Sequence, residues 1–530
     1  MTATFGTAPD PTLGDLDEDA RNAAFEKVQA RLPDVWKRMR LNEPDESVVV
    51  VPSVTPDPAA AQPGGALIQA MEERFLFLLL LLRQPRLRMV YVTSMPINPS
   101  IIEYYLALLP GVIPSHARAR LSLVAVGDSS WRSLTAKLLA RPRLLSHIIS
   151  LVPDPSRSHL VPYNTTGLER DLSIALGIPM YGADPRLFPL GTKTGCRRLF
   201  AEAGVNYPAG FEDLRTVGDV VQALSVLRSR RPAAGDAMVK LNEGVSGRGN
   251  AVVDLRDLPA PGDAREPTEL EHRVRGMALE DESSTVDAFL ARLLERGGIA
   301  EERIVGDEMR SPSVQLRITP FGEIELLSTH DQLLGGPSGQ SYLGCVFPAD
   351  PAYARTITED ARLVGAVLRT KGVLGRFAID FVVVRRGPVW TSYAIEVNLR
   401  KGGTTHPFLT LQFLTDGRYD PDTALFTTPT GRERHLVATD HLEDPSLCGL
   451  RVDDLFDLVA RHGLHFDQAR QAGIVFHMIS CLTELGRVGM TAVGESPRTA
   501  QIIYDRAERI LLREARSSIV PRPLAAINRS

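Results

Sequence analysis

Three oxygen-bearing side chains stand in two apolar runs of the sequence. Asp380 lies inside the run 377–384, and Glu396 and Asn398 lie two residues apart at the end of the run 393–397. A polar turn containing glycine and proline joins the runs, which predicts a β-hairpin whose alternate side chains share a face. Carboxylate and amide oxygens are the ligands that Mg²⁺ prefers, and the ion commonly completes its shell with substrate phosphates. The hairpin therefore predicts a site for Mg²⁺ or Mn²⁺ together with a nucleotide.

A glycine-rich loop supports the prediction of a nucleotide-binding site. The letters EGVSGRGN fill 243–250 between predicted strands at 237–242 and 251–255, and small residues let backbone N–H groups approach phosphate oxygens. The loop joins two strands and lacks GK[ST], so it is not a Walker A loop. Lys240 on the preceding strand adds an ammonium group beside the phosphates. The alternatives are a plain hairpin turn, a solvated edge lysine and, for the acidic hairpin, a structural ion pair with Arg376, Arg400 or Lys401.

Composition indicates a soluble globular chain with small-molecule partners. Its 530 residues are 44% hydrophobic and 23% charged with a formal net charge of -4, so neither nucleic acid nor an anionic membrane is expected as a partner. The four cysteines form no CxxC pair, which predicts neither a disulfide framework nor a zinc site. The acidic N-terminus is not a signal peptide, and the run 75–82 is far shorter than the ~20 residues of a membrane span. We expect a cytoplasmic protein.

Four segments are expected along the chain. Residues 1–45 predict a tail and a leading helix. Residues 46–190 alternate apolar strands with helices, which predicts an α/β domain with a parallel sheet, and its turns lack the GxGxxG of a dinucleotide site. Residues 191–410 carry the loop and the hairpin, and residues 411–530 predict a small α+β domain. Finer expectations are a helix over 67–83, an irregular insertion over 259–282 and a loop-rich stretch over 416–445.

The motifs follow one another in a fixed order over about residues 185–410. A basic helix from Lys193 precedes Lys240, the glycine-rich loop, an acidic stretch and the hairpin. In this order the chain resembles the ATP-grasp superfamily. Within it the chain is similar to peptide ligases of the pheganomycin type, through STHDQ at 328–332, NLRKGGTTHP at 398–407 and VFHMISCLTELGRVGMTAVG at 475–494. The resemblance implies an ATP-grasp fold, preceded by a Rossmann-like pre-ATP-grasp domain and followed by a small α+β domain.

The resemblance also implies roles for individual residues. Lys193 and Lys240 match the lysines that contact ATP phosphates, and Asp380, Glu396 and Asn398 match the Mg²⁺ ligands. The remaining assignments are a flexible lid over 243–249 that includes Glu243, Gly244, Ser246, Gly247 and Gly249, an adenine-binding linker from Glu301 to Ile304, and a ribose carboxylate at Glu308 or Asp307. Arg400, Arg317 and Lys240 are expected beside the reacting groups, Gln332 is a further candidate to face substrate, and a part for His330 or His406 in the chemistry is left open.

The activity that the resemblance implies is ATP-dependent amide formation. A substrate carboxylate attacks the γ-phosphate of ATP, and an amine then displaces phosphate from the acylphosphate. The expected partners are a small-molecule acid and an amine, either amino acids or peptides, in natural-product biosynthesis, with a homodimer as the expected assembly. The alternatives are a phosphotransferase that uses the same site on a hydroxyl, and a nucleotide-binding scaffold without turnover.

Overall fold

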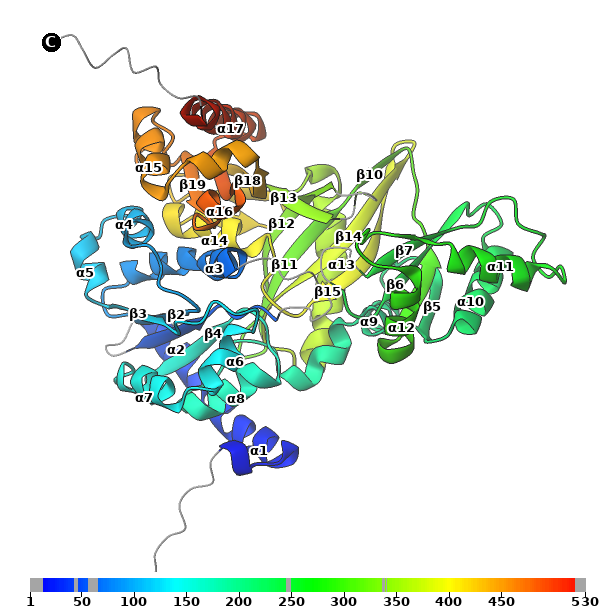
Figure 1. Ribbon diagram of the computed structural model, residues 1–530, viewed down its shortest axis with the longest axis horizontal. Helices are drawn as coiled ribbons and strands as arrows, with labels where there is room; N and C mark the ends of the chain where they lie inside the picture. The colour runs from blue at the N-terminus through cyan, green and yellow to red at the C-terminus, as the bar shows by residue number, and fades with distance from the viewer. Residues whose placement is uncertain are drawn as a thin grey trace, which may run out of the picture. The chain divides into compact units, whose positions relative to one another are not determined.

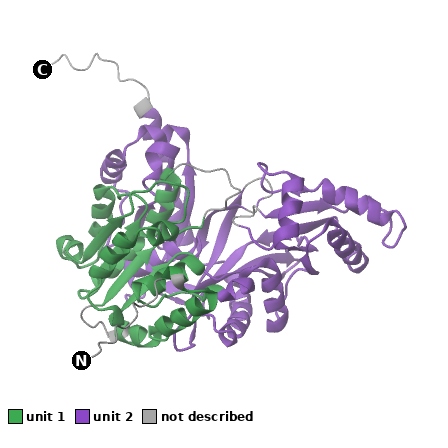
Figure 2. Ribbon diagram, turned by 60° about the horizontal axis from the view of Figure 1, so that its bottom comes forward, with its two compact units in different colours: residues 1–185 green, residues 186–530 purple. Residues whose placement is uncertain are grey.

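The computed structural model describes residues 13–41, 46–55, 65–244, 249–335, 339 and 341–519. The chain divides into two compact units, Met1–Pro185 and Arg186–Ser530, which Figure 2 distinguishes by colour. The expected N-terminal tail falls largely on residues 1–12, outside the described part. No helix of the described part is long and apolar enough to cross a membrane.

A parallel sheet forms the centre of the first unit. Among the described residues, its strands are ordered β3-β2-β1-β4 and every pairing is parallel. Val49, Val92 and Leu160 on these strands pack into a buried core with helix residues such as Leu138 and Leu172. The predicted α/β domain with a parallel sheet is confirmed. The strands are β1 Ser47–Val51, β2 Arg88–Thr93, β3 Leu121–Ala125 and β4 Ser158–Pro162, and the α-helices are α1 Glu18–Gln29, α2 Leu32–Leu41, α3 Gly65–Glu73, α4 Pro99–Ala107, α5 Pro114–Arg118, α6 Leu134–Leu139, α7 Pro142–Ser150 and α8 Gly167–Leu176.

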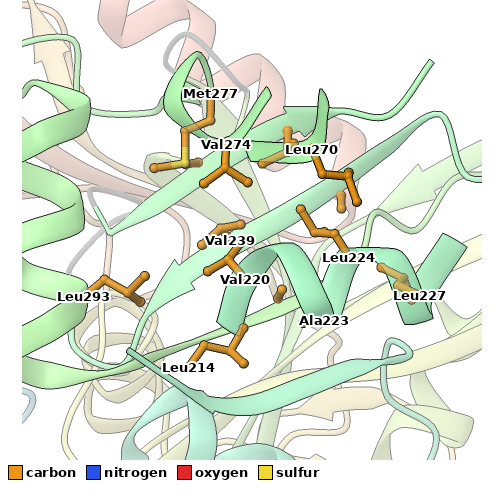
Figure 3. Close-up of a cluster of buried hydrophobic side chains, with 14 of the residues drawn as sticks. Leu214, Val220, Ala223, Leu224, Leu227, Val239, Leu270, Val274, Met277 and Leu293 are labelled. Carbon is orange, nitrogen blue, oxygen red and sulfur yellow. The ribbon is translucent and has the colours of Figure 1, made fainter. Parts of the chain in front are cut away.

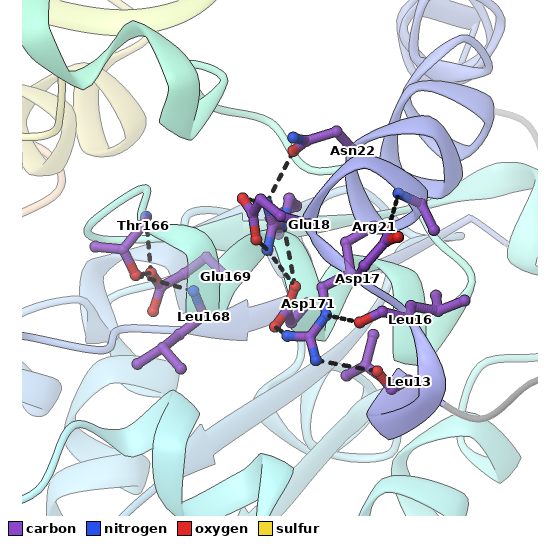
Figure 4. Close-up of polar contacts among 12 residues, drawn as sticks. Leu13, Leu16, Asp17, Glu18, Arg21, Asn22, Thr166, Leu168, Glu169 and Asp171 are labelled. Atoms are coloured by element: carbon purple, nitrogen blue, oxygen red, sulfur yellow. Dashed lines mark hydrogen bonds and ion pairs between the residues drawn. The ribbon is translucent and has the colours of Figure 1, made fainter.

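The leading helix α1 is fastened to α8 by ion pairs. Asp17 caps α1 by accepting a hydrogen bond from the Ala20 N–H at 2.8 Å. The Arg21 guanidinium then lies 2.7 Å from Asp171 (Figure 4), and Arg170 pairs with Glu18. The N-terminal helices therefore belong to the first compact unit.

The leucine-rich stretch departs from the helix expected over 67–83. The α-helix α3 ends at Glu73, and a 3₁₀ helix spans Leu76–Arg83 with Leu76, Leu79 and Leu82 fully buried. A segment that is apolar on all sides carries no 3.6-residue period, so the sequence cannot distinguish the two kinds of helix.

A small antiparallel sheet opens the second unit. Its described strands are ordered β5-β9-β6-β7-β8, and α10 contributes Val220, Leu224 and Leu227 to the core on which Val239 of β6 packs (Figure 3). The elements are α9 Lys193–Ala203, β5 Gly210–Leu214, α10 Val217–Arg230, β6 Asp236–Leu241, β7 Asn250–Asp254, α11 Glu266–Arg275, β8 Ala278–Leu279, α12 Val286–Arg296 and β9 Gly298–Glu302.

The irregular insertion expected over 259–282 is wrong, because it contains α11 and β8. Helix α11 buries Leu270 and Val274, one helical turn apart, against the core of the small sheet (Figure 3). Most other residues of the helix are charged, so two apolar positions were too weak a pattern to reveal it.

A large sheet forms the rest of the second unit. Its described strands are ordered β10-β14-β11-β12-β13-β18-β20-β19, with β15 paired to β14 (Figure 1). Helix α13 contacts β11 and β12 and buries Ile357, Ala361 and Leu368. The elements up to this point are β10 Glu308–Arg310, β11 Pro312–Ile318, β12 Ile324–Gly335, β13 Ser341–Phe347, α13 Pro351–Thr370, β14 Gly375–Arg386 and β15 Val389–Asn398.

The C-terminal segment extends this same sheet. Strand β18 pairs antiparallel with β13 and β20, and β19 pairs with β20. Residues 411–519 therefore belong to the same compact unit as the hairpin. The loop-rich stretch expected over 416–445 is wrong for 435–443, where β18 lies. The elements are α14 Thr405–Thr415, β16 Arg418–Asp420, β17 Leu425–Thr427, β18 His435–Glu443, α15 Val452–Arg461, β19 Gly473–His477, α16 Cys481–Leu485, β20 Arg487–Gly494 and α17 Pro497–Ile519.

Candidate nucleotide and metal site

The β14–β15 hairpin brings the three expected metal ligands onto one face. Asp380 is paired in register with Glu396, and Ala378 with Asn398, while Phe381 and its alternate neighbours point into the core. The Asn398 amide donates to Asp380 Oδ2 at 2.9 Å. Gln332 on β12 donates to Asp380 Oδ1 at 3.1 Å. The Asp380 carboxylate is thereby fixed between two amides.

The two carboxylates are close enough to perturb one another. Burial, together with the charge of Glu396, raises the pKa of Asp380 to about 6. Burial also opposes ionisation of Glu396, but the positive charges of Lys193, Arg400 and Lys240 leave its pKa lowered. Two facing carboxylates and an amide are a donor set of the kind that suits a hard divalent cation. The residues therefore fit Mg²⁺ or Mn²⁺.

Lys193 reaches the hairpin from the first turn of α9. Its Nζ lies 2.6 Å from Glu396 Oε2, and although burial alone would lower its pKa, Glu396 leaves that pKa raised. Asn242 fixes the start of α9, because its side-chain oxygen accepts from the Thr194 N–H at 3.0 Å and its carbonyl from the Lys193 N–H at 3.2 Å. Sequence reasoning gave Asn242 no role, although its position between β6 and the glycine-rich loop could have suggested one.

Lys240 lies in a buried ion network. Its Nζ is 2.6 Å from Glu301 Oε1, and Arg197 Nη1 is 2.9 Å from Glu301 Oε2. Glu301 itself lies within β9, between β5 and β6. The expected linker of 301–304 therefore begins in the last two residues of β9. The irregular stretch that joins β9 to β10 begins after Glu302 and contains Ile304.

The glycine-rich loop connects β6 to β7 as expected. Its ends lie close together, because the Leu241 N–H donates to the Gly249 carbonyl at 2.8 Å and a Cβ on Gly244 would lie 3.1 Å from the Gly249 nitrogen. Glu243 is exposed. Ser246 and Gly247 belong to 245–248, outside the described residues.

Arg400 lies at the site, whereas Arg317 and Glu308 are held elsewhere. The charge of Arg400 acts on both Asp380 and Glu396. Ser313 on β11 is the register partner of Asp380. Arg317 lies on the same face of β11 but four residues further along, so its backbone is roughly 13 Å from that of Ser313. Its guanidinium pairs with Glu325. Glu308 on β10 lies 2.5 Å from Arg310 and 2.9 Å from Arg385. The structure does not bring these two residues to the metal ligands.

His330 is a core residue. It is fully buried beside Phe347 and Phe408, its Nε2 lies 2.9 Å from Ser328 Oγ, and burial lowers its pKa to about 3. The ring is therefore neutral near pH 7 and is shielded from substrate. His406 lies in a different cluster, with Asp440 and His477.

Comparison with known proteins places the chain in a family. The model described as IQCH-like, ATP-grasp matches residues 187–273 and 264–420, and the PGM1 C-terminal domain model matches residues 454–507. An L-propargylglycine--L-glutamate ligase from Streptantibioticus cattleyicolor is 30% identical over 450 residues, which cover 83% of this chain and 89% of the relative. The chain belongs to the ATP-grasp family. The predicted resemblance is thereby confirmed.

Three further proteins are similar to this chain. The IQ motif-containing protein H of Danio rerio is 24% identical over 488 residues, which cover 82% of this chain and 45% of that relative. A biotin carboxylase-beta-gamma-ATP complex from Campylobacter jejuni has a TM-score of 0.51 at 12% identity, with coverage of 90% of this chain and 96% of the other. The ADP complex of purK, an N5-carboxyaminoimidazole ribonucleotide synthetase, has a TM-score of 0.50 at 10% identity, with coverage of 89% and 98%. At such low identity these structures show the fold alone.

Proposed function

We propose that this protein is an ATP-dependent carboxylate–amine ligase that forms an amide bond. The observation that carries the proposal is the 30% identity to a ligase across most of both chains. The hairpin, with Asp380 and Glu396 in register and Lys193 paired to Glu396, adds a site suited to ATP phosphates. A relative that joins two substrates favours ligation over phosphotransfer or a scaffold without turnover.

The proposed reaction has two steps. A carboxylate oxygen of the acid attacks the γ-phosphorus of ATP, the bond to the β-bridging oxygen breaks, and ADP leaves with that electron pair. An amine then attacks the acyl carbon, phosphate leaves, and the amine loses a proton. The products are an amide, ADP and phosphate. Such chemistry depends chiefly on position and charge, and needs no protein nucleophile.

Asp380, Glu396 and Asn398 are the residues that we propose to hold Mg²⁺ or Mn²⁺. Bound there, the cation would supply positive charge to the phosphate oxygens. Lys193 and Lys240 contribute two ammonium groups from α9 and β6, and Arg400 contributes a guanidinium next to the same carboxylates. The lid role that the resemblance gives to residues 243–249 would serve to keep water from the acylphosphate, which water would otherwise hydrolyse.

The proposed substrates are a small-molecule carboxylate and an amine, both of the amino-acid or short-peptide class. The ligase relative is named for two amino acids, and an enzyme that joins such units suits the assembly of a peptide natural product. We place the enzyme in a reducing cytoplasm, since all four cysteines are free thiols. The homodimer stays a prediction, which light scattering after size-exclusion chromatography checks.

A phosphate-release screen tests this function. Amino acids and short peptides are supplied in pairs as acid and amine with ATP and Mg²⁺, and products are identified by mass. We expect a pair that yields one amide and one phosphate per ATP. A phosphorylated product without an amide would contradict the ligase.

A further inference from the structure

Three buried side chains from distant parts of the second unit meet at one point. His406 lies in the first turn of α14, Asp440 in β18 and His477 at the end of β19. Their exposed fractions are 3%, 1% and 3%. The meeting point lies in the C-terminal extension of the large sheet, and none of these residues belongs to the nucleotide and metal site described above.

The three facing atoms form a small triangle. His477 Nε2 lies 2.8 Å from Asp440 Oδ1, His406 Nε2 lies 3.3 Å from the same oxygen, and the two Nε2 atoms lie 3.0 Å apart. With Asp440 ionised, no assignment of protons turns all three edges into hydrogen bonds. If both rings donate to Asp440, two donors face each other, and if only one ring carries a proton on Nε2, at least one edge joins two lone pairs. One atom that accepts all three lone pairs at once would remove this conflict.

A metal ion is such a partner. Imidazole nitrogens and carboxylate oxygens bind Zn²⁺ at about 2.0–2.2 Å, and two ligands of a tetrahedral ion are then about 3.3 Å apart. The observed edges of 2.8, 3.0 and 3.3 Å are within a few tenths of an ångström of that value. Two histidines and one carboxylate are also a recurrent set of three protein ligands, which leaves a fourth position for water.

The neighbouring strand leaves room for one of the rings. Gly489 on β20 is the register partner of His477, and a Cβ at Gly489 would lie 2.2 Å from His477 Nε2. Any side chain at residue 489 would displace the imidazole from the triangle. The absence of a side chain at Gly489 thus leaves the space that the His477 ring occupies.

We propose that His406, Asp440 and His477 bind a transition-metal ion, with Zn²⁺ as the principal candidate. The ion is chemically separate from the one at Asp380 and Glu396, because nitrogen ligands suit transition metals whereas Mg²⁺ takes oxygen ligands. Its position suggests what it does. The ion would join α14, through His406, to β18 and β19. Thr405, next to His406, donates to Gln315 of β11 at 3.0 Å, so α14 is held to β11 as well.

Cobalt provides a direct test in the full chain. The protein is stripped with a chelator, dialysed and titrated with Co²⁺, because four-coordinate Co²⁺ absorbs visible light much more strongly than six-coordinate Co²⁺. We expect one equivalent of strongly absorbing Co²⁺ per chain, displaced by Zn²⁺ and accompanied by a rise in melting temperature. His477→Gln should abolish the absorption, whereas the matched control His441→Gln, adjacent to Asp440 but outside the triangle, should retain it. Glu396→Gln should retain it as well.

Two outcomes overturn the proposal: a wild-type chain that takes up no equivalent of tightly bound ion, or a His477→Gln variant that binds Co²⁺ like the wild type. If His477→Gln does not fold, X-ray absorption on the wild-type Zn²⁺ form decides instead. Two imidazoles with oxygen ligands support the site, and a shell that contains sulfur or only oxygen refutes it.

Discussion

The Lys193 ammonium lies 2.6 Å from Glu396, on the hairpin face that also carries Asp380. A lysine expected to contact phosphate and a carboxylate expected to bind metal thus neutralise each other in the structure. A cation bound to Glu396 would neutralise its charge in place of the lysine, which could then contact phosphate. The two roles are therefore coupled, and a change in one residue will alter the other.

Glu396→Gln should abolish turnover. It removes one metal ligand and also leaves Lys193 buried without its partner, at a cost of about 2 kcal/mol in the free energy of unfolding. ADP formation and thermal melting measure the two effects. Glu359→Gln is the matched control, since Glu359 pairs with Arg355 on the exposed face of α13. Turnover equal to wild type would remove the hairpin from the mechanism.

Lys240→Met should raise the KM for ATP and also lower stability. The contact with Glu301 is buried, so its loss should cost about 2 kcal/mol of unfolding free energy. Adding Glu301→Gln should restore part of the stability but not the affinity for ATP. Lys371→Met, which removes a surface ion pair with Glu202, serves as control. An unchanged KM for ATP would make Lys240 a purely structural residue.

The nucleotide product should be ADP, and the acid should be activated before the amine arrives. The cationic groups gather around the carboxylates that we assign to the metal, and a metal bridging the β- and γ-phosphates favours attack at the γ-phosphorus. With the acid alone, hydroxylamine should trap a hydroxamate. Nucleotide chromatography gives the second readout, in which AMP and pyrophosphate would contradict the acylphosphate.

Glu72→Gln should stabilise the first unit more as the pH rises from about 5 to 8. Burial is the main cause that raises the pKa of Glu72 to about 7, from 4.5, although Ser94 donates to both of its oxygens. The folded state therefore binds more protons than the unfolded state between these values, and the wild type loses stability with rising pH, by at most roughly 3 kcal/mol. The difference in unfolding free energy between the two proteins, measured against pH, checks this. A difference independent of pH would show that Glu72 is not protonated in the fold.

Local patterns in the sequence predicted the local structure. The hairpin, the glycine-rich loop and the parallel sheet follow from alternation, turn residues and apolar runs, and the structure contains all three. The position of Lys193 beside Glu396 could not be predicted in this way, because it depends on how α9 packs against β15. The family resemblance gave each of the two residues a role but did not predict their contact.

Contacts across the sheets were the part that the sequence did not reveal. Glu301 and Lys240 are 61 positions apart and meet because β9 lies beside β6. His406 and His477 are separated by 71 positions and meet through the order of the C-terminal strands. No short motif links either pair.

The continuity of the large sheet determines whether a truncated protein would stay monomeric. Strand β13 is covered by β18, and the two strands approach so closely at Gly344 that a Cβ there would lie 2.1 Å from the Ala438 carbonyl oxygen. A chain cut at residue 410 would keep every proposed ligand for ATP and Mg²⁺ yet present the unpaired N–H and C=O groups of β13 to solvent. Such an edge pairs with other chains. A protein of residues 1–410 should therefore aggregate.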